Sequence, residues 1–194
     1  MKKITFQGEY GAYSHLACTK AFSDLAPIPC RTFESALDSV RAGDSDLAMI
    51  PVENSVAGRV ADIHYLLGDY DLKIYAEHFQ MVEHQLLVQS GVSLKEIKSV
   101  RSHTMAIGQC QAVIKELGLQ TIVMADTAGS AKYISEQENC KDAAIASKLA
   151  AETYGLEIAR DNIQDMQHNT TRFLIMSKEL QQKKEENIKY LTSC

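Results

Sequence analysis

The sequence predicts an α/β fold, because short apolar runs alternate with stretches of helical periodicity along most of its 194 residues. This alternation is typical of βα units around a largely parallel sheet. A long β-rich run, Leu72–Gln89, interrupts the pattern, which then restarts. With 45% hydrophobic and 23% charged residues, the chain can bury a core as one domain or as two small lobes.

Three apolar runs in the first third have β propensity, and a helical pattern follows each of them. Gly43 and Pro51 mark the ends of elements, since glycine and proline interrupt regular structure. We therefore predict strands and helices in alternation: Lys3–Phe6, Ile28–Thr32 and Leu47–Pro51 as strands, and Ser14–Phe22, Phe33–Arg41 and Val60–Leu67 as helices.

The Leu72–Gln89 run is too long for one ordinary strand. We expect the chain to pass there from one lobe into another. Beyond it the same alternation returns and predicts a second lobe. Its expected strands are Ile97–Ser102, Thr121–Met124 and Ala143–Ala146, and its expected helices are Met105–Leu117, Thr127–Glu136 and Lys148–Tyr154.

An apolar, β-prone segment at Thr170–Met176 follows the polar stretch Gln164–Asn169, which has the composition of a loop. We expect this late strand to return to the first lobe and make that lobe discontinuous. The predicted lobes are then residues 1–78 with 170–178, and residues 79–169. Residues 179–194, rich in Lys, Glu and Gln, are expected to form a tail or linker.

Composition and patterning argue against several classes of function. The formal charge is −5 and the basic residues form no stripe, so we expect no nucleic-acid partner. We expect no membrane partner, because no segment has roughly 18 to 20 apolar residues and the N-terminus lacks a signal-peptide core. The five scattered cysteines indicate reduced thiols in a cytoplasmic protein. The six histidines lack metal-ligand spacing, and we expect no metal site.

Two candidate ligand sites follow strands in the first third. Gly8 and Gly11 lead from a strand into a helix, where free backbone N–H groups could hold an anion. The alternative is an ordinary βα turn, since the spacing is not the dinucleotide fingerprint. Glu53, Asn54 and Ser55 follow the third strand, at the edge where open α/β sheets bind ligands. Asn54 and Ser55 could hold a carboxylate or hydroxyl, or they could cap a helix while Glu53 is solvated.

Two more candidates lie further along the chain. Ser102 and His103 stand at a strand end that enters a helix, and their alternative roles are a helix cap and a structural histidine. In Asn169–Phe173 a polar loop enters a buried strand. There Arg172 has the planar fork that recognises carboxylates, and the hydroxyl of Thr171 could donate a proton or a hydrogen bond. A surface-paired arginine beside a β-forming threonine is the alternative.

Taken in order, these stretches resemble the catalytic domain of the prephenate dehydratase family across nearly the whole chain. The family's Gly-x-x-Gly-Thr-Phe-Ser turn corresponds to Gly8–Ser14, and its Pro-x-Glu-Asn-Ser to Pro51–Ser55. Its closing Asn-x-Thr-Arg-Phe corresponds to Asn169–Phe173. Between them stand further family-like stretches: Ser102-His103, Gln109-Cys110, Ala143–Ser147, Tyr154-Gly155-Leu156 and Asn162–Asp165.

The resemblance implies a two-lobed fold of the type II periplasmic-binding-protein kind, with substrate in the cleft between the lobes. It also implies a cofactor-free lyase that converts prephenate to phenylpyruvate by losing carbon dioxide and water, in a homodimer or homotetramer. Thr171 would be catalytic, easing hydroxide out as water. The substrate-binding residues would be Asn54, Ser55, Arg172, Ser14, Phe173, Ser102, His103 and Glu53.

Two departures from the family pattern stand out. The usual threonine of the first turn is Ala12, so a hydroxyl contact from that position is absent. The stretch after Lys178 is too short for the phenylalanine-sensing ACT domain that family members generally carry. Two other functions remain open: an arogenate dehydratase, which performs the same elimination on the amino analogue, and a non-catalytic small-molecule-binding module of the same fold.

Overall fold

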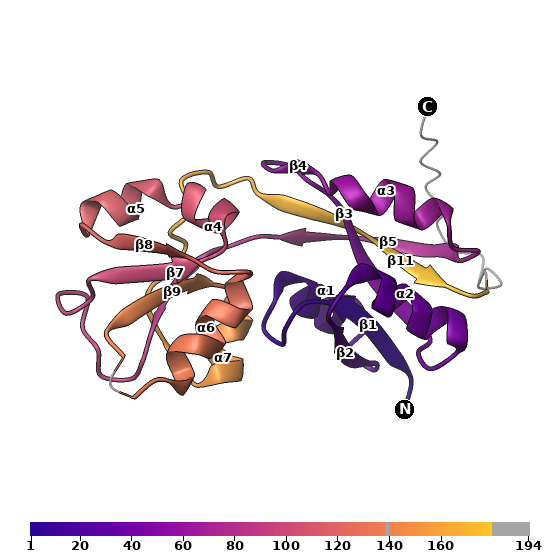
Figure 1. Cartoon of the computed structure of the whole chain (residues 1–194), viewed down its shortest axis with the longest axis horizontal. Coiled ribbons are helices and arrows are strands. Elements are labelled where there is room, and N and C mark those ends of the chain that lie inside the picture. The colour runs from indigo at the N-terminus through magenta and orange to yellow at the C-terminus, as the bar shows by residue number, and fades with distance from the viewer. Residues whose placement is uncertain (139, 180–194) are drawn as a thin grey trace.

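The computed structural model describes residues 1–138 and 140–179, and it has two lobes (Figure 1). Each lobe is built on one β-sheet with helices on both faces. The N-terminus lies on the first lobe, where the described part of the chain also ends (Figure 1). From residue 180 onward, the tail expected at residues 179–194 lies outside the described residues.

The first lobe contains the sheet with strand order β2-β1-β3-β11-β5, and the short β4 pairs with β3. β1 is parallel to β2 and β3, whereas β11 is antiparallel to β3 and β5. The strands are β1 (Lys3–Gln7), β2 (Ala26–Cys30), β3 (Leu47–Asn54), β4 (Gly58–Arg59), β5 (Lys73–Met81) and β11 (Thr170–Ser177).

Helix α1 (Tyr13–Ala21) covers one face of this sheet, and α2 (Phe33–Ala42) and α3 (Ala61–Gly68) cover the other. Phe6 and Phe173 are among the largest fully buried side chains, and both pack in the layer beneath α1. Removing such apolar surface from water is the main favourable contribution to folding. The sheet is therefore covered on both faces.

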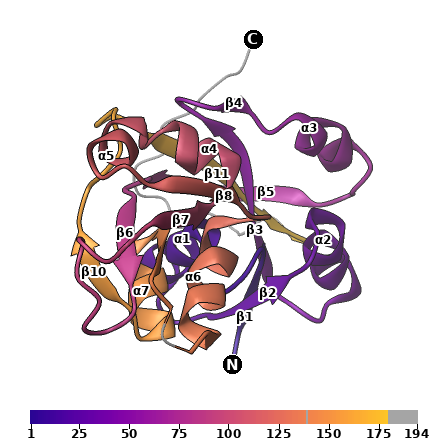
Figure 2. The same cartoon turned by 60° about the vertical axis from the view of Figure 1, so that its left-hand side comes forward.

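The second lobe contains the sheet with strand order β10-β6-β9-β7-β8. Helices α4 and α5 cover one face and α6 and α7 the other, as Figure 2 shows. The strands are β6 (Gln85–Val88), β7 (Ser99–Ser102), β8 (Gln120–Val123), β9 (Asp142–Ala146) and β10 (Glu157–Arg160). The helices are α4 (Thr104–Gly108), α5 (Gln111–Glu116), α6 (Thr127–Glu136) and α7 (Lys148–Tyr154).

Local signals explain several helix ends. α2 starts at a capping box in which the Thr32 hydroxyl accepts from the Ser35 N–H, and it ends at Gly43 with φ 87°. α7 starts at Ser147, whose hydroxyl accepts a backbone N–H, and it ends at Gly155 with φ 65°. Glycine adopts this left-handed conformation without steric cost, so both helices stop where it occurs.

The α/β class and the two-lobed organisation are confirmed, but the expectation of a largely parallel sheet is wrong. Both sheets are mixed: in the second lobe β7 is parallel to β8 and β9, while β6 is antiparallel to β9 and β10. The chain leaves the first lobe through β5 and returns to it through β11, and it enters the second lobe through β6 and leaves it through β10. All four strands pair antiparallel with a neighbour. Such strands do not belong to a βαβ crossover, which is what enforces parallel pairing.

The single helix expected over Met105–Leu117 is two helices, α4 and α5. The second begins at Gln111, where the Asp165 carboxylate accepts from the backbone N–H groups of Gln111 and Ala112 at 2.9 and 3.1 Å. A carboxylate at the first N–H groups stabilises a new helix start. Strands β4 and β10 have no counterpart among the predicted elements, and they are two and four residues long.

The chain crosses between the lobes through two segments that lie side by side (Figure 1). The run Leu72–Gln89 forms β5 and β6, separated by residues 82–84, and β11 returns beside β5 with Thr171 opposite Gln80. β5 continues to Met81, past the lobe boundary predicted at residue 78. The lobe boundaries themselves stay a prediction.

The loop between β1 and α1 docks on the second lobe. The carbonyl of Gly11 accepts from the Ser147 hydroxyl at 2.5 Å, and the carbonyl of Tyr10 accepts from the Tyr154 hydroxyl at 2.7 Å. Gly11 has φ 85°, and a Cβ there would lie 2.7 Å from the Cα of Ala150. Glycine is needed at this position because two backbones meet there.

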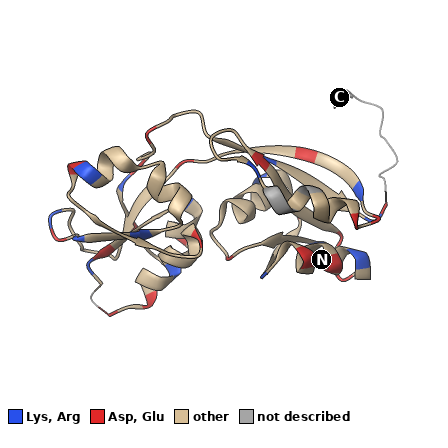
Figure 3. Ribbon diagram, turned by 45° about the horizontal axis from the view of Figure 1, so that its top comes forward, with Lys and Arg blue, Asp and Glu red and all other residues tan. Residues whose placement is uncertain are grey.

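In the described residues, charged side chains, cysteines and potential metal ligands are not clustered. Basic and acidic residues are interspersed over both lobes (Figure 3). In the part of the chain that the structure describes, no helix is long and apolar enough to cross a membrane. Within the same ranges, no group of three His, Cys, Asp or Glu side chains could hold a metal ion. The described cysteines are free thiols: Cys18, Cys30, Cys110 and Cys140.

Candidate active site

A cavity of about 170 Å³ lies where the crossing segments meet the two lobes. Side chains from both lobes line it, and in the described residues this lining includes no lysine, arginine, aspartate or glutamate. The lining residues are Tyr13, Asn54, Ala57, Val82, His84, His103, Met105, Ala106, Gln109, Thr127, Asn169 and Thr171.

The sheet of the first lobe brings Asn54 and Thr171 to this cavity. Asn54 is the last residue of β3, and Thr171, near the start of the antiparallel β11, lies opposite it. The carboxyl ends of parallel strands are where open α/β sheets hold ligands. The predicted candidates from two motifs therefore meet at one edge of the sheet.

The hydroxyl of Thr171 is held by a side-chain amide. Asn54 Nδ2 donates to Thr171 Oγ1 at 2.9 Å and to Asn169 Oδ1 at 2.7 Å. Asn54 Oδ1 accepts from the backbone N–H groups of Val56 and Ala57. Within residues 1–138 and 140–179, the Thr171 hydroxyl proton has no acceptor, so it is free to be donated to a ligand.

A second polar group borders the cavity from the other lobe. Asn169 Nδ2 donates to Gln109 Oε1 at 2.9 Å, and His84 Nε2 lies 2.8 Å from the same oxygen. His84 Nδ1 and the Glu83 carbonyl oxygen lie 2.8 and 2.9 Å from the Tyr13 hydroxyl oxygen, whose single hydrogen is donated to one of them at a time. Hydrogen bonds thus join the two lobes around the cavity.

Burial keeps the titratable groups of this cluster neutral. Burial lowers the pKa of His84, and the hydrogen bond to Gln109 opposes that effect. The pKa of Tyr13 is raised well above its ordinary value, first by burial and then by the neighbouring Cys110 and Glu83. At neutral pH the cavity therefore presents an uncharged imidazole and an uncharged phenol.

Of three further predicted residues, one lines the cavity and two are next in sequence to residues that line it. His103 lines it, and its Nδ1 accepts from the Met105 N–H at 3.3 Å. Ser55 joins β3 to the β11 segment, because its hydroxyl accepts from the Thr170 N–H and donates to the His168 carbonyl. Ser14 lies half-buried in the first turn of α1.

Four residues expected to bind substrate lie elsewhere. Arg172 follows Thr171 in a strand, and neighbours in a strand point to opposite faces, so its guanidinium meets the Glu77 carboxylate at 2.7 and 3.2 Å. Glu53 lies opposite Arg172 in the β3–β11 register and is exposed. Phe173 is 1% exposed in the core beneath α1.

Ser102 is also fully buried, and it donates to the Ile145 carbonyl at 2.7 Å, which ties β7 to the neighbouring β9. Arg172, Glu53, Phe173 and Ser102 therefore do not line this cavity, and their role in substrate binding stays a prediction. The physical reason is that strand alternation and core packing, rather than nearness in the motif, set side-chain direction.

Five polar residues of the cavity were missing from the predicted site: Tyr13, His84, Gln109, Thr127 and Asn169. Gln109 and Asn169 stand inside motifs that the family resemblance uses, so that signal could have found them. His84 stands alone in a β-rich run, and a lone histidine there gives no functional signal.

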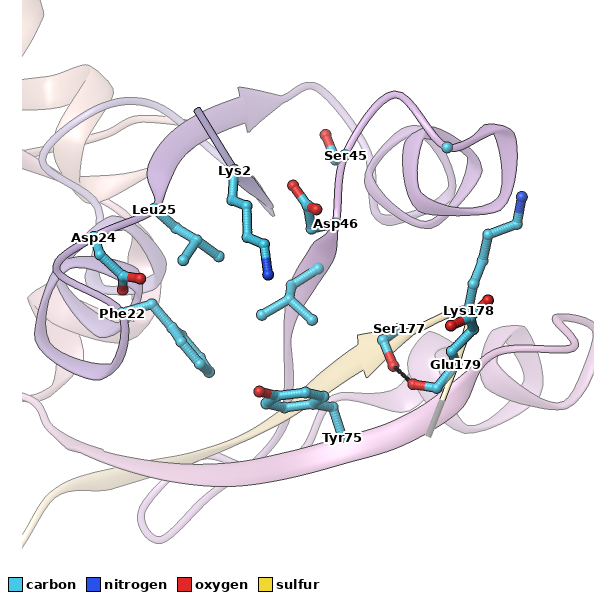
Figure 4. Close-up of a pocket in the computed structure, with 12 residues that line it drawn as sticks. Lys2, Phe22, Asp24, Leu25, Ser45, Asp46, Tyr75, Ser177, Lys178 and Glu179 are labelled. Carbon is cyan, nitrogen blue, oxygen red and sulfur yellow. Dashed lines mark hydrogen bonds between the residues drawn. The ribbon is translucent and has the colours of Figure 1, made fainter. Parts of the chain in front are cut away.

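A larger depression of about 470 Å³ lies at the opposite end of the first-lobe sheet (Figure 4). Among its lining residues, Lys2 precedes β1, Asp46 precedes β3 and Ser177 ends β11. The depression therefore faces the amino ends of the parallel strands. Residues 178 and 179, where the described chain ends, complete its wall. Its position is the reverse of the edge where α/β sheets place ligands.

The fold and the cavity define a two-lobed α/β protein with an uncharged polar site between its lobes. The chain belongs to the prephenate dehydratase family, whose model matches residues 4–181. This family is the one that the sequence motifs resemble. Thr171 and Asn54 fall within the matched range.

Relatives agree with the family assignment. The chain is 48% identical over 175 residues to a bifunctional N-acyl-homoserine lactone acylase/prephenate dehydratase of Komagataeibacter europaeus, covering 90% of this chain and 62% of that protein. It is 42% identical over 177 residues to arogenate dehydratase/prephenate dehydratase 1, chloroplastic, of Arabidopsis thaliana, covering 91% and 45%.

A solved structure agrees as well. The crystal structure of prephenate dehydratase from Arthrobacter aurescens in complex with L-Phe matches with a TM-score of 0.83 and 32% identity, over 91% of this chain and 60% of that one. The chain spans less than two thirds of the length of each of these relatives.

Proposed function

We propose that the chain is the catalytic part of a prephenate dehydratase, which converts prephenate to phenylpyruvate with loss of carbon dioxide and water. Family membership and the names of the relatives support this reaction. The observation that carries the proposal is the Thr171 hydroxyl: it accepts from Asn54 at the cavity, and its own proton can be donated to a ligand.

A hydroxyl donor at this place meets the main chemical demand of the reaction. Hydroxide is a poor leaving group and departs more easily as water, so a hydrogen bond to the departing oxygen lowers the barrier. Threonine is a weak acid, and both proton donation and electrostatic assistance fit the Thr171 hydroxyl. The ring becomes aromatic as one carboxylate leaves, and aromatisation supplies the driving force.

Two helices that begin at the cavity offer neutral donors for the substrate carboxylates. α1 begins at Tyr13 and α6 at Thr127, and first-turn N–H groups favour an anion. Ala12 provides α1 with no side-chain cap, whereas the Asp126 carboxylate caps α6 by accepting from Gly129. α1 is therefore the stronger anchor, and unequal anchoring suits a reaction that expels one carboxylate and retains the other.

We also propose a cytoplasmic homodimer or homotetramer. The free thiols of the described cysteines and the bacterial relative support a reducing compartment, while the named Arabidopsis relative is chloroplastic. The oligomeric state is inferred from the family.

Arogenate is the second candidate substrate, because relatives from Arabidopsis thaliana and Petunia hybrida are named arogenate dehydratases. The test compares kcat/KM for the two compounds, following phenylpyruvate from prephenate by ultraviolet absorbance and phenylalanine from arogenate by chromatography. We expect the larger kcat/KM with prephenate. A larger value with arogenate would reassign the substrate, and binding of prephenate without product would indicate a non-catalytic module.

A further inference from the structure

Side-chain hydrogen bonds run without a break from the second lobe to Thr171. His84 Nε2 lies 2.8 Å from Gln109 Oε1, which also accepts from Asn169 Nδ2 at 2.9 Å. Asn169 Oδ1 accepts from Asn54 Nδ2 at 2.7 Å, and the same Nδ2 donates to Thr171 Oγ1 at 2.9 Å. We call these five residues the interlobe hydrogen-bond chain.

The backbone next to Asn54 decides the direction of this chain. Asn54 Oδ1 accepts from the N–H groups of Val56 and Ala57 at 3.0 and 2.8 Å. A backbone N–H can only donate, so a reversed Asn54 amide would place its NH₂ group against two donors. Asn54 Nδ2 must therefore face Asn169 and Thr171.

Each amide of the interlobe hydrogen-bond chain then fixes the orientation of the next one. Asn169 presents its oxygen to Asn54, so its NH₂ group faces Gln109, which presents an oxygen in turn. That oxygen lies against His84 Nε2, and this nitrogen must then carry a hydrogen. His84 Nδ1 is then left as an acceptor, so the single hydrogen of the Tyr13 hydroxyl is donated to Nδ1 rather than to the Glu83 carbonyl 2.9 Å away.

At the other end, Thr171 Oγ1 is an acceptor toward Asn54, and its proton is left for a ligand. We propose that His84 and Gln109 are positioning residues. The backbone sets the direction of the Asn54 amide, and His84 and Gln109, acting through Asn169, hold that amide against Thr171, so that the hydroxyl stays a hydrogen-bond donor toward the substrate. The identity of that substrate rests on the proposed function; the direction of the interlobe hydrogen-bond chain does not.

The interlobe hydrogen-bond chain is buried, and its residues come from different parts of the fold. His84 and Asn169 are each 2% exposed, so water cannot replace a bond lost by a reversed amide. Gln109 follows α4 of the second lobe and His84 lies in the segment 82–84 that crosses to that lobe, whereas Asn54 and Thr171 come from the first lobe. The Thr171 hydroxyl is thus oriented by both lobes together and loses that support when they separate.

Nitrogen-15 NMR of the histidine side chains shows which ring nitrogen of His84 carries the hydrogen. It therefore reports the direction of the interlobe hydrogen-bond chain without any assay of activity. At pH 7 we expect a neutral His84 with its hydrogen on Nε2, its signal identified by its absence from His84→Gln. A hydrogen on Nδ1 would overturn the inferred direction, whatever the protein catalyses. The Nε2–H form in a protein without dehydratase activity would support the direction and overturn only the proposed function.

A pair of variants at Gln109 tests the positioning role. Gln109→Glu keeps an oxygen that accepts from both neighbours, whereas Gln109→Met has a similar length and no such oxygen. We expect kcat of the Met variant to fall roughly tenfold with KM within about threefold of wild type, and the Glu variant to recover most of that kcat. Gln111→Met is the matched control, because Gln111 donates to the Ile107 carbonyl away from this chain, and it should keep the wild-type kcat.

Thermal unfolding of the three variants separates positioning from folding. Equal loss of kcat in Gln109→Glu and Gln109→Met, with unchanged melting temperatures, would contradict the positioning role. Should Gln109→Met fail to fold, the NMR measurement on the wild-type protein still decides the direction of the interlobe hydrogen-bond chain.

Discussion

Asn54 and Thr171 lie 117 positions apart in the chain, and the side-chain amide of the first donates to the hydroxyl oxygen of the second at 2.9 Å. Pairing of β3 with β11 places them directly opposite each other. The amide fixes which way the hydroxyl can donate, so a pairing of two strands sets the chemistry of the cavity.

Thr171→Ala should lower kcat about 100-fold or more while KM changes little, because the hydroxyl assists a leaving group whose charge grows in the transition state. Steady-state kinetics with prephenate checks this. Thr171→Ser should keep a substantial part of kcat, and Thr170→Ala, one position away in the same strand, is the control. Near-normal turnover by Thr171→Ala would remove this residue from the chemistry.

Asn54→Asp should depress kcat roughly tenfold or more although the side chain keeps its shape. An aspartate still accepts from the Val56 and Ala57 N–H groups, but it has no hydrogen to donate to Thr171. The Thr171 hydroxyl would then turn its proton toward the carboxylate and away from the substrate. Steady-state kinetics on Asn54→Asp and Asn54→Ala check this. A wild-type kcat in the Asp variant would contradict the role of the Asn54 amide as a donor to Thr171.

Gly11→Ala should destabilise the fold more than Gly91→Ala. Both glycines have positive φ, 85° and 80°, where an alanine costs about 1 to 2 kcal/mol. At Gly11 a Cβ would also lie 2.7 Å from the Ala150 Cα of the other lobe, whereas at Gly91 nothing lies within 4 Å. Urea unfolding of both variants measures the difference, and equal losses would show that the lobes part readily there.

Arg172→Ala should change KM by less than about threefold, because the guanidinium is paired with Glu77 on the sheet face opposite to Thr171. The side chains of this ion pair are 37% and 27% exposed, so its loss should cost no more than about 1 kcal/mol of stability. Glu77→Gln is the matched variant and should behave alike. A large rise in KM confined to Arg172→Ala would instead support a role for Arg172 as a carboxylate anchor.

Stability should fall as pH drops below about 6.5, the ordinary pKa of histidine. Burial lowers the pKa of His84 and of His15 in the folded protein, so the unfolded chain binds more protons once the pH falls below its own histidine pKa. Their contribution to stability is complete above about pH 6.5 and is lost as the pH falls toward the folded pKa.

Urea unfolding between pH 8 and pH 5 measures this dependence. His84→Gln should flatten the curve on the acid side, since a glutamine does not titrate. An unchanged slope in that variant would mean that His84 is not responsible.

Short-range signals account for the elements that were predicted to the residue. Thr127–Glu136 and Lys148–Tyr154 form helices with those bounds. Their caps, Asp126, Ser147 and Gly155, are adjacent to them in the chain. The break between α4 and α5 was not predictable in this way, because the capping carboxylate comes from a distant loop.

Within the last motif, alternation along a strand already separates Thr171 from Arg172. The motif alone groups them as partners, and only the place of β11 between β3 and β5 shows which of them meets the cavity.

By itself, the sequence determined the α/β class, the order of most elements, and Asn54 and Thr171 as candidates, because these depend on local propensity and on motifs. The tertiary structure alone decided the antiparallel strand directions, the burial of Phe173, and the place of His84 and Gln109 in the cavity that Thr171 lines. Those features depend on contacts between segments far apart in the chain, and the free energies of such contacts cannot be derived from the local sequence pattern.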